Sequence, residues 1–395
     1  MKAEWDRPAD AAVVGETAAV LLSAGGRSGV AEGGLESVGA PGRNEKLSID
    51  RLGEALAKAE PAVPPGEQAD LKNKVLESAR TGLAKLNQGE GAEGFTFGES
   101  VGLEAVILTD GERPSLFVTD GFVSLDAPDI GTWAADLGRV KNQIRTVTAA
   151  VGRVDVPVKP WYAGTCFVAA EGLVVTNRHV LEVIGTQQAD GSWILRWPDK
   201  TTVNFLGEDG AKEQTQFKVT GVAFAGPNPI NNTINFANLD MAVLRVDPAS
   251  DNGAKFPQPL TFERDVSKPE TDRDLYVVGF PGEPKTWVFG GKPPVGHETQ
   301  QVISSLFNSK FGVKRLAPGI VKAGPGSVPT DDRKWIAAHD ASTLGGNSGS
   351  CVVDLKLNGL RVVALHFAGA NRAQNWSHAV GCLHEHLSQF PVKFA

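Results

Sequence analysis

Six consecutive small residues, GGNSGS at positions 345–350, constrain the fold most, because glycine adopts backbone conformations that other residues avoid. A serine hydroxyl is a weak nucleophile at its own pKa, so it needs a nearby base and donors for the oxyanion formed on attack. Without a Cβ, Gly346 can turn its N–H together with that of Ser348 into one small pocket. The segment therefore predicts either a plain loop or a turn that presents Ser348 as a nucleophile.

Two other segments contain the residues that such a serine needs. Residues 172–180, GLVVTNRHV, form an apolar, β-branched run that predicts a strand leading to His179. Residues 238–246, NLDMAVLRV, place Asp240 directly before a run apolar enough for a mostly buried strand. A buried carboxylate needs a partner, and one that accepts the imidazole N–H of His179 would fix its tautomer and stabilise the imidazolium.

Together, TNRHV, NLDMAVLRV and GGNSGS resemble the three catalytic signatures of chymotrypsin-fold, trypsin-like serine peptidases, in particular the bacterial branch that includes the glutamyl endopeptidases. The order His179, Asp240, Ser348 is the chymotrypsin order, and it differs from the subtilisin and α/β-hydrolase orders. The resemblance implies a mainly β fold of two antiparallel six-stranded β-barrels. It also implies a serine endopeptidase in which His179 is general base and then acid, Asp240 orients it, and Ser348 attacks. Taken singly, these residues have structural alternatives: a strand-end histidine, a strand cap and a turn serine.

The resemblance also places the substrate-binding residues, at Ser342, Thr343, His366, Phe367 and Gly369. No aspartate lies near Ser342, so an Arg or Lys side chain would lose its hydration there without gaining a counter-charge. The strings ASTLGGNSGS and ALHFAGA resemble those of glutamyl endopeptidases, in which the residues matching Thr343 and His366 bind an acidic side chain. We expect cleavage after Glu, with Gln or Asp next, and substrate pairing with the backbone of Phe367 to Gly369. The alternative for His366 is a core histidine.

Composition limits the cellular compartments and the classes of partner that we expect. The chain has 395 residues, a formal net charge of −7 and three cysteines, which cannot all pair. Its start lacks the basic region and apolar core of a secretion signal, and no apolar run approaches the roughly 18 residues of a membrane-spanning helix. We therefore expect a cytoplasmic enzyme that acts on proteins or peptides, with neither a nucleic acid nor a membrane as a partner.

The chain divides into three expected parts: a mobile tail over residues 1–46, an N-terminal extension over 47–145, and a peptidase domain over 146–395 that ends in a helix. The extension is expected to regulate the peptidase or to dock a partner protein. Its expected elements are a short helix from Ser48 that stops before Pro61, a helix over 71–86, a hairpin of strands 103–108 and 115–119, and a helix over 130–145.

Three alternatives remain at this point. The spacing of His378, Cys382 and His386 would align zinc ligands on a helix, but Gly381 weakens that helix and no second cysteine completes a pair, so we expect no metal or other cofactor. The whole chain could also be a binding scaffold with idle catalytic residues. Finally, the same three residues could hydrolyse esters rather than peptides.

Overall fold

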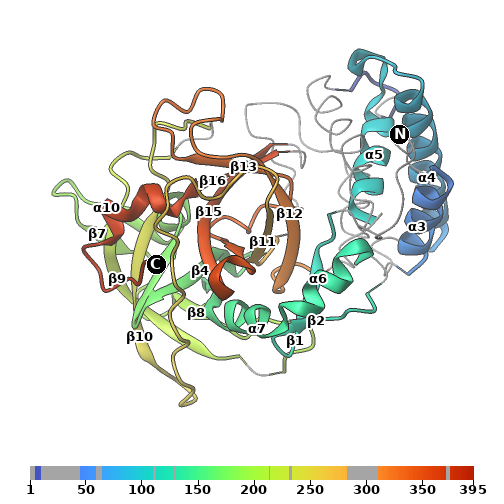
Figure 1. Cartoon of the computed structure of the whole chain (residues 1–395). Coiled ribbons are helices and arrows are strands. Elements are labelled where there is room, and N and C mark those ends of the chain that lie inside the picture. The colour runs from blue at the N-terminus through green and yellow to red at the C-terminus, as the bar shows by residue number, and fades with distance from the viewer. Residues whose placement is uncertain are drawn as a thin grey trace.

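The computed structural model describes residues 5–9, 45–58, 65–109, 113–127, 130–212, 214–230, 234–282, 310–370 and 374–395. Two β-barrels lie side by side, and a helical unit stands at one flank of them (Figure 1). Among the helices in these ranges, none is both long and apolar enough to cross a bilayer. The mainly β architecture with two closed antiparallel barrels confirms the predicted fold class.

The first barrel closes in the strand order β10-β5-β4-β3-β8-β9, and every neighbouring pair is antiparallel. A short helix, α8, follows β5, and a two-stranded ribbon of β6 and β7 comes next. The elements are β3 (Val151–Asp155), β4 (Tyr162–Ala170), β5 (Leu173–Thr176), α8 (Arg178–Ile184), β6 (Gly185–Gln187), β7 (Trp193–Leu195), β8 (Thr202–Asn204), β9 (Gln216–Ala225) and β10 (Ala242–Ser250).

The second barrel consists of β11, β14, β15, β16, β13 and β12, and the pairing of β11 with β12 closes it. Short helical turns follow β14 and β16. The elements are β11 (Asp274–Gly279), β12 (Arg315–Ala323), β13 (Ile336–His339), β14 (Cys351–Asp354), η4 (Leu357–Gly359), β15 (Arg361–Ala370), β16 (Gln374–Ala379), η5 (Val380–Leu383) and α10 (His384–Leu387). Because η5 and α10 begin only after β16, no single helix aligns His378 with Cys382 and His386.

The helical unit has its own apolar core, separate from that of the barrels. Its elements are α3 (Glu45–Lys58), α4 (Pro65–Asn87), η2 (Ala92–Gly94) and α5 (Phe97–Thr109). The first two helices were predicted, but the predicted strand over 103–108 is wrong because these residues continue α5. A short apolar run fits a buried helix as well as a strand, and here Leu103 and Val106 are fully buried between the helices.

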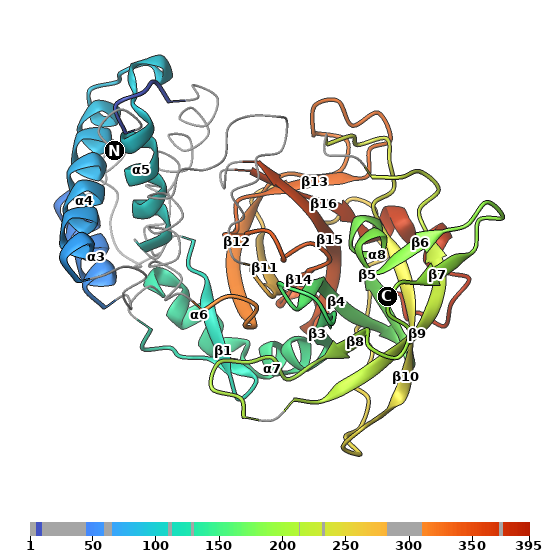
Figure 2. The same cartoon turned by 180° about the vertical axis from the view of Figure 1, so that it is seen from behind.

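The segment between the helical unit and the first barrel belongs structurally to the barrels. The hairpin of β1 and β2 turns at Asp120 and Gly121, whose φ angles of 50° and 72° suit a tight turn, and it extends the second barrel's sheet through β12. The single helix expected over 130–145 is interrupted at Val140, which leaves helical geometry. The elements are β1 (Leu116–Thr119), β2 (Phe122–Val123), η3 (Gly131–Trp133), α6 (Ala134–Arg139) and α7 (Lys141–Ala150), and Figure 2 shows β1, α6 and α7 at one end of the barrels.

The observed apolar cores extend across the boundaries that we predicted after residues 46 and 145. Buried apolar side chains from Leu116 to Val123 and from Ile130 to Ala150 belong to the same core as those of the barrel strands. Residues 5–9 pack on the helical unit, with Trp5 only 6% exposed, so this part of the expected tail is held in place. Most of the remaining tail lies outside the described residues.

Candidate active site

The pairing of β5 with β10 brings His179 and Asp240 together. Thr176 on β5 lies opposite Ala242 on β10, and each predicted site residue lies close to one end of this pair. His179 occupies the first turn of α8, just after the strand, and its Nδ1 lies 2.6 Å from Oδ2 of Asp240. The backbone N–H of His179 donates to the other carboxylate oxygen at 3.0 Å. Both oxygens of Asp240 therefore hold His179, one through its ring and one through its backbone.

Burial and charge act in opposite directions on this pair. Burial alone would lower the pKa of His179, but the charge and hydrogen bond of Asp240, with a contribution from Glu182, raise it above the ordinary 6.5. Burial alone would raise the pKa of Asp240, and the contact with His179 instead lowers it below 3.8. The side chain of His179 is 31% exposed and that of Asp240 only 5%, so the imidazole faces solvent and the carboxylate lies behind it.

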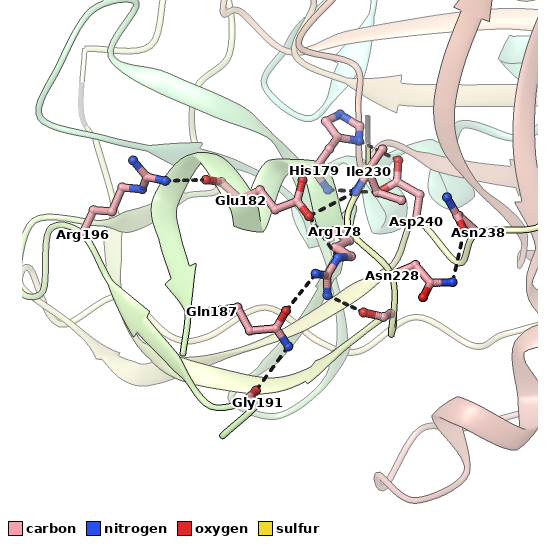
Figure 3. Close-up of polar contacts among 11 residues, drawn as sticks. Arg178, His179, Glu182, Gln187, Gly191, Arg196, Asn228, Ile230, Asn238 and Asp240 are labelled. Carbon is pink, nitrogen blue, oxygen red and sulfur yellow. Dashed lines mark hydrogen bonds and ion pairs between the residues drawn. The ribbon is translucent and has the colours of Figure 1, made fainter. Parts of the chain in front are cut away.

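Arg178 anchors this half of the site, and the sequence analysis did not identify it. The residue is only 1% exposed, and its guanidinium donates to the carbonyl of Gly226, to Oε1 of Gln187 at 3.0 Å and to Oε1 of Glu182 at 3.0 Å. The same Glu182 oxygen accepts the N–H of Ile230 at 3.2 Å (Figure 3). Arg178 and Glu182 thus tie α8 to Gly226 and Ile230, which follow β9 in the chain and precede Asp240.

Two further residues hold the backbone of Asp240. Nδ2 of Asn177 donates to the carbonyl of Asp240 at 2.8 Å, and the backbone N–H of Asp240 donates to Nε2 of His378 at 3.1 Å. Because Nε2 accepts here, His378 must be neutral with its proton on Nδ1, and burial lowers its pKa to about 4. His378 lies on β16 of the second barrel, so this bond crosses between the barrels. Only its position in the folded chain could reveal this role.

Ser348 lies in the loop between β13 and β14, against the first barrel. Its carbonyl accepts the N–H of Thr165 at 2.9 Å. A Cβ on Gly164 would lie 3.0 Å from that carbonyl oxygen and 2.7 Å from Val180, the residue after His179. In the part of the chain that the structure describes, the Ser348 hydroxyl makes no hydrogen bond with His179. Such bonds are often long in unliganded enzymes and shorten when substrate binds.

The glycines of the GGNSGS loop fix two N–H groups. Gly346 has φ 93°, and the carbonyl before it, that of Gly345, accepts the N–H of Gly282 at 2.5 Å. Because N–H and C=O point in opposite directions across a trans peptide, this bond turns the N–H of Gly346 away from Gly282. Thr165 Oγ1 donates to the carbonyl of Gly346 at 2.8 Å. Among the hydrogen bonds of the described residues, the N–H groups of Gly346 and Ser348 have no partner, so both can bind an oxyanion.

Asn347, between these two residues, is a buried amide. Its Oδ1 accepts the hydroxyl of Ser350 at 3.3 Å. The side chain therefore satisfies its amide oxygen within the loop rather than through an ion pair.

The predicted substrate-binding residues Ser342, Thr343 and His366 are all buried at the base of this loop. The hydroxyl of Thr343 donates to Oδ1 of Asn375, whose Nδ2 donates to the carbonyl of Ala341 at 2.8 Å. Since only the amide nitrogen can donate to a carbonyl, the second bond fixes the orientation of Asn375. The oxygen of Thr343 can therefore only accept a further hydrogen bond.

His366 is neutral near pH 7. Burial is the main reason that its pKa lies well below 6.5, and the nearby His339 and His179 lower it further. Its ring centroid lies 5.5 Å from that of His339, and its Nδ1 is buried without a hydrogen-bond partner in the described structure. A neutral imidazole offers one donor and one acceptor, so His366 can donate a single hydrogen bond to a bound side chain.

The edge of β15 beyond His366 is open on one side. β14 pairs with β15 only up to Leu365, and the described strands pair with Ala368 and Gly369 only from β16. Phe367 lies at an irregularity in that pairing. This edge, on the side of Ser348, can therefore accept an added strand.

The metal alternative receives no support from the arrangement. Among the described residues, no group of three or more His, Cys, Asp or Glu side chains could hold a metal ion. Sγ of Cys382 faces the carbonyl of Lys334 at 3.6 Å, and His378 contacts Asp240 instead.

Comparisons with known proteins place the chain in a family. Residues 164–365 match the model of the trypsin-like peptidase domain. The chain is 31% identical over 396 residues to a protein of Lysobacter enzymogenes named as a probable serine protease, covering 95% of this chain and 98% of that one.

Two solved structures are also similar. The inactive form of the Rv3671c protease aligns with a TM-score of 0.36 and 19% identity, over 65% of this chain and 96% of that chain. An inactive serine-to-alanine mutant of Rv3671c from M. tuberculosis H37Rv aligns with a TM-score of 0.33 and 19% identity, over 62% and 87%. The match of the family model to about half of the chain and the full-length relative carry the assignment: this chain belongs to the trypsin-like peptidases and is a serine endopeptidase.

Proposed function

We propose that His179, Asp240 and Ser348 hydrolyse peptide bonds through an acyl-enzyme. The contact of 2.6 Å between His179 and the buried carboxylate of Asp240 carries this proposal, because it leaves the outer ring nitrogen free to take the proton of Ser348. Asp240 stays ionised, since its pKa is lowered, and it stabilises the imidazolium formed during attack.

The reaction follows from these positions. Ser348 attacks the scissile carbonyl as His179 accepts its proton, and the N–H groups of Gly346 and Ser348 bind the oxyanion. His179 then protonates the leaving amine, and the same residues activate water to release the acyl group. The open edge of β15 at Phe367 to Gly369 would align the substrate as an antiparallel strand.

We further propose that the residue before the cut is Glu or Gln. Thr343 can only accept a hydrogen bond and neutral His366 can donate one, and a Gln amide supplies the matching donor and acceptor. A Glu side chain matches the same pair when it is protonated. The carboxylate form instead needs His366 to be protonated, which its lowered pKa opposes near pH 7.

Cleavage of a peptide library by the full chain tests both parts, with Ser348→Ala as the matched control. We expect cuts after Gln and Glu that the variant does not make. For paired peptides that differ only in this residue, the ratio of kcat/KM for Glu over Gln should rise as pH falls, because both Glu and His366 gain protons. Dominant cleavage after Arg, Lys or aromatic residues would refute the specificity. Hydrolysis of simple esters without peptides would favour the esterase alternative, and no hydrolysis of either would favour a scaffold.

We also propose a cellular compartment for the protein and a role for its helical unit. The buried thiols of Cys166 and Cys351 are unpaired, and Cys382 is also a free cysteine, which supports action in the reducing cytoplasm. The helical unit α3–α5 has an apolar core of its own. This separate core supports a role for the unit in docking a partner protein or in regulating the peptidase.

A further inference from the structure

Residues 113–119, which we call the strap, leave the helical unit and lie along the second barrel. Leu116 and Phe117 of the strap pair with Leu316 and Arg315 of β12. Arg315 also donates to the carbonyl of Ser115 at 2.8 Å, and its guanidinium lies 3.6 Å from the ring centre of Phe117. The strap is therefore fixed to the second barrel by its backbone and by side chains.

Arg113, at the start of the strap, forms a buried two-pronged ion pair with Asp340. Nε and a terminal nitrogen of Arg113 each lie 2.6 Å from a carboxylate oxygen, and the two side chains are 3% and 0% exposed. Oδ1 of Asp340 also accepts the N–H of Ile320 at 2.7 Å, and Nζ of Lys322 lies 3.9 Å from the other oxygen. A bidentate pair of this kind fixes orientation as well as distance.

The backbone of Arg113 makes a second contact, with a proposed substrate-binding residue. Its carbonyl accepts the hydroxyl of Ser342 at 2.6 Å. One residue thus holds both ends of the segment 340–342, at Asp340 through its side chain and at Ser342 through its carbonyl. Thr343, which follows directly, lies between this segment and the loop of Ser348. Moving Arg113 would therefore move the side of the binding site that Ser342 and Thr343 form.

We propose that Arg113 is a specificity-determining positioning residue, through which the segment N-terminal to the barrels orders the site that binds the residue before the cut. The inference rests on the proposed function, because it assigns that site to Ser342 and Thr343. A buried ion pair adds little net stability over apolar side chains of similar size, but removing one partner leaves an uncompensated charge. Its main contribution here is geometric, and selectivity is the property that it controls.

The test uses Arg113→Met in the full chain and two substrates that differ only before the cut, one with Gln and one with Ala. A small phosphorylating agent, diisopropyl fluorophosphate, reports on Ser348 without using the binding site. We expect the ratio of kcat/KM for Gln over Ala to fall by about tenfold, the effect of losing one well-placed hydrogen bond, with little change in the rate at which Ser348 is phosphorylated. Arg113→Lys, which keeps the charge, should restore part of the ratio.

Controls separate positioning from folding. Arg139→Met removes a guanidinium from an exposed ion pair with Asp136 and should leave both readouts unchanged. If Arg113→Met does not fold, the double variant Arg113→Met with Asp340→Asn removes both charges and keeps an acceptor for Ile320. A double variant that melts as the wild type does but has lost selectivity supports the proposal.

Three outcomes would count against the inference or its basis. Unchanged selectivity in a folded variant overturns it. A parallel loss of selectivity and of phosphorylation by diisopropyl fluorophosphate also overturns it, because it would indicate a general structural role. Wild-type protein that cleaves neither peptide would instead refute the proposed function on which the inference rests.

Discussion

The two barrels hold their parts of the active site by different means. In the first barrel, charged side chains hold the site: the carboxylate of Asp240 binds the ring and the backbone N–H of His179, and buried Arg178 on α8 donates to the carbonyl of Gly226. In the second barrel, backbone bonds and the φ angle of Gly346 orient the N–H groups around Ser348. The comparison indicates that a proton-transfer pair requires buried side chains that position a charge. An oxyanion site instead requires a turn that orients backbone N–H groups.

The substitution with the largest expected effect removes the nucleophile, which belongs to the second barrel. Ser348→Ala should lower kcat for peptide cleavage by roughly four to six orders of magnitude, because the three residues act as a unit. The melting temperature should change little, since the side chain makes no described hydrogen bond. Steady-state kinetics with active-site titration of the wild type gives the measurement. Residual activity within a hundredfold of wild type would mean that another residue attacks.

A second substitution tests whether backbone geometry determines the activity of that loop. Gly346→Ala would place a Cβ 2.7 Å from the N–H nitrogen of Gly282 and from the carbonyl oxygen of Phe280, so the peptide must move. We expect kcat to fall by about 10²–10³, the effect of losing one oxyanion donor, with a smaller change in KM. Gly359→Ala is the matched control, because its φ of 92° is nearly the same but open space surrounds it. Equal losses in kcat for the two variants would contradict this explanation.

The first barrel should determine the acidic limb of the pH profile. His179 must be neutral to accept a proton, so kcat/KM should fall about tenfold per pH unit below its pKa, which lies above 6.5. Glu182 raises that pKa, so Glu182→Gln should move the limb to lower pH. The profiles of the two proteins on one Gln peptide provide the measurement. A limb that does not move, or moves upward, would show that another group titrates.

The smallest effect is expected from removing the hydrogen bond between Asp240 and His378, which joins the two barrels. His378→Phe leaves the buried N–H of Asp240 without its acceptor, which should cost about 1–3 kcal/mol of unfolding free energy. We expect a fall in kcat of up to roughly tenfold as Asp240 shifts. His378→Gln can still accept the bond and should retain more of both. Denaturant unfolding and kinetics on the same samples test this, and a stable, fully active Phe variant would exclude the role.

The two-barrel fold was predicted through the resemblance that three local motifs carry. Each motif also has its own physical reason to place a site residue: a strand before His179, a strand after Asp240 and a glycine turn around Ser348. Residues 103–108 were predicted wrongly because a short, mostly apolar run lacks the periodicity that separates helix from strand. The roles of Arg113 and His378 could not be predicted, and His378 was considered only as a possible zinc ligand. Their contacts join positions 227 and 138 residues apart, and no local pattern encodes which distant side chain lies opposite.

Peptide mapping after treatment with a fluorophosphonate tests the central claim most directly. The claim is that His179, held by Asp240, activates Ser348 alone among the serines of this chain. We predict one phosphonyl group per molecule, located on Ser348, with a labelling rate that falls as His179 becomes protonated and drops sharply in Asp240→Asn. Labelling that is absent, that lies on another serine, or that proceeds equally in Asp240→Asn would contradict the account.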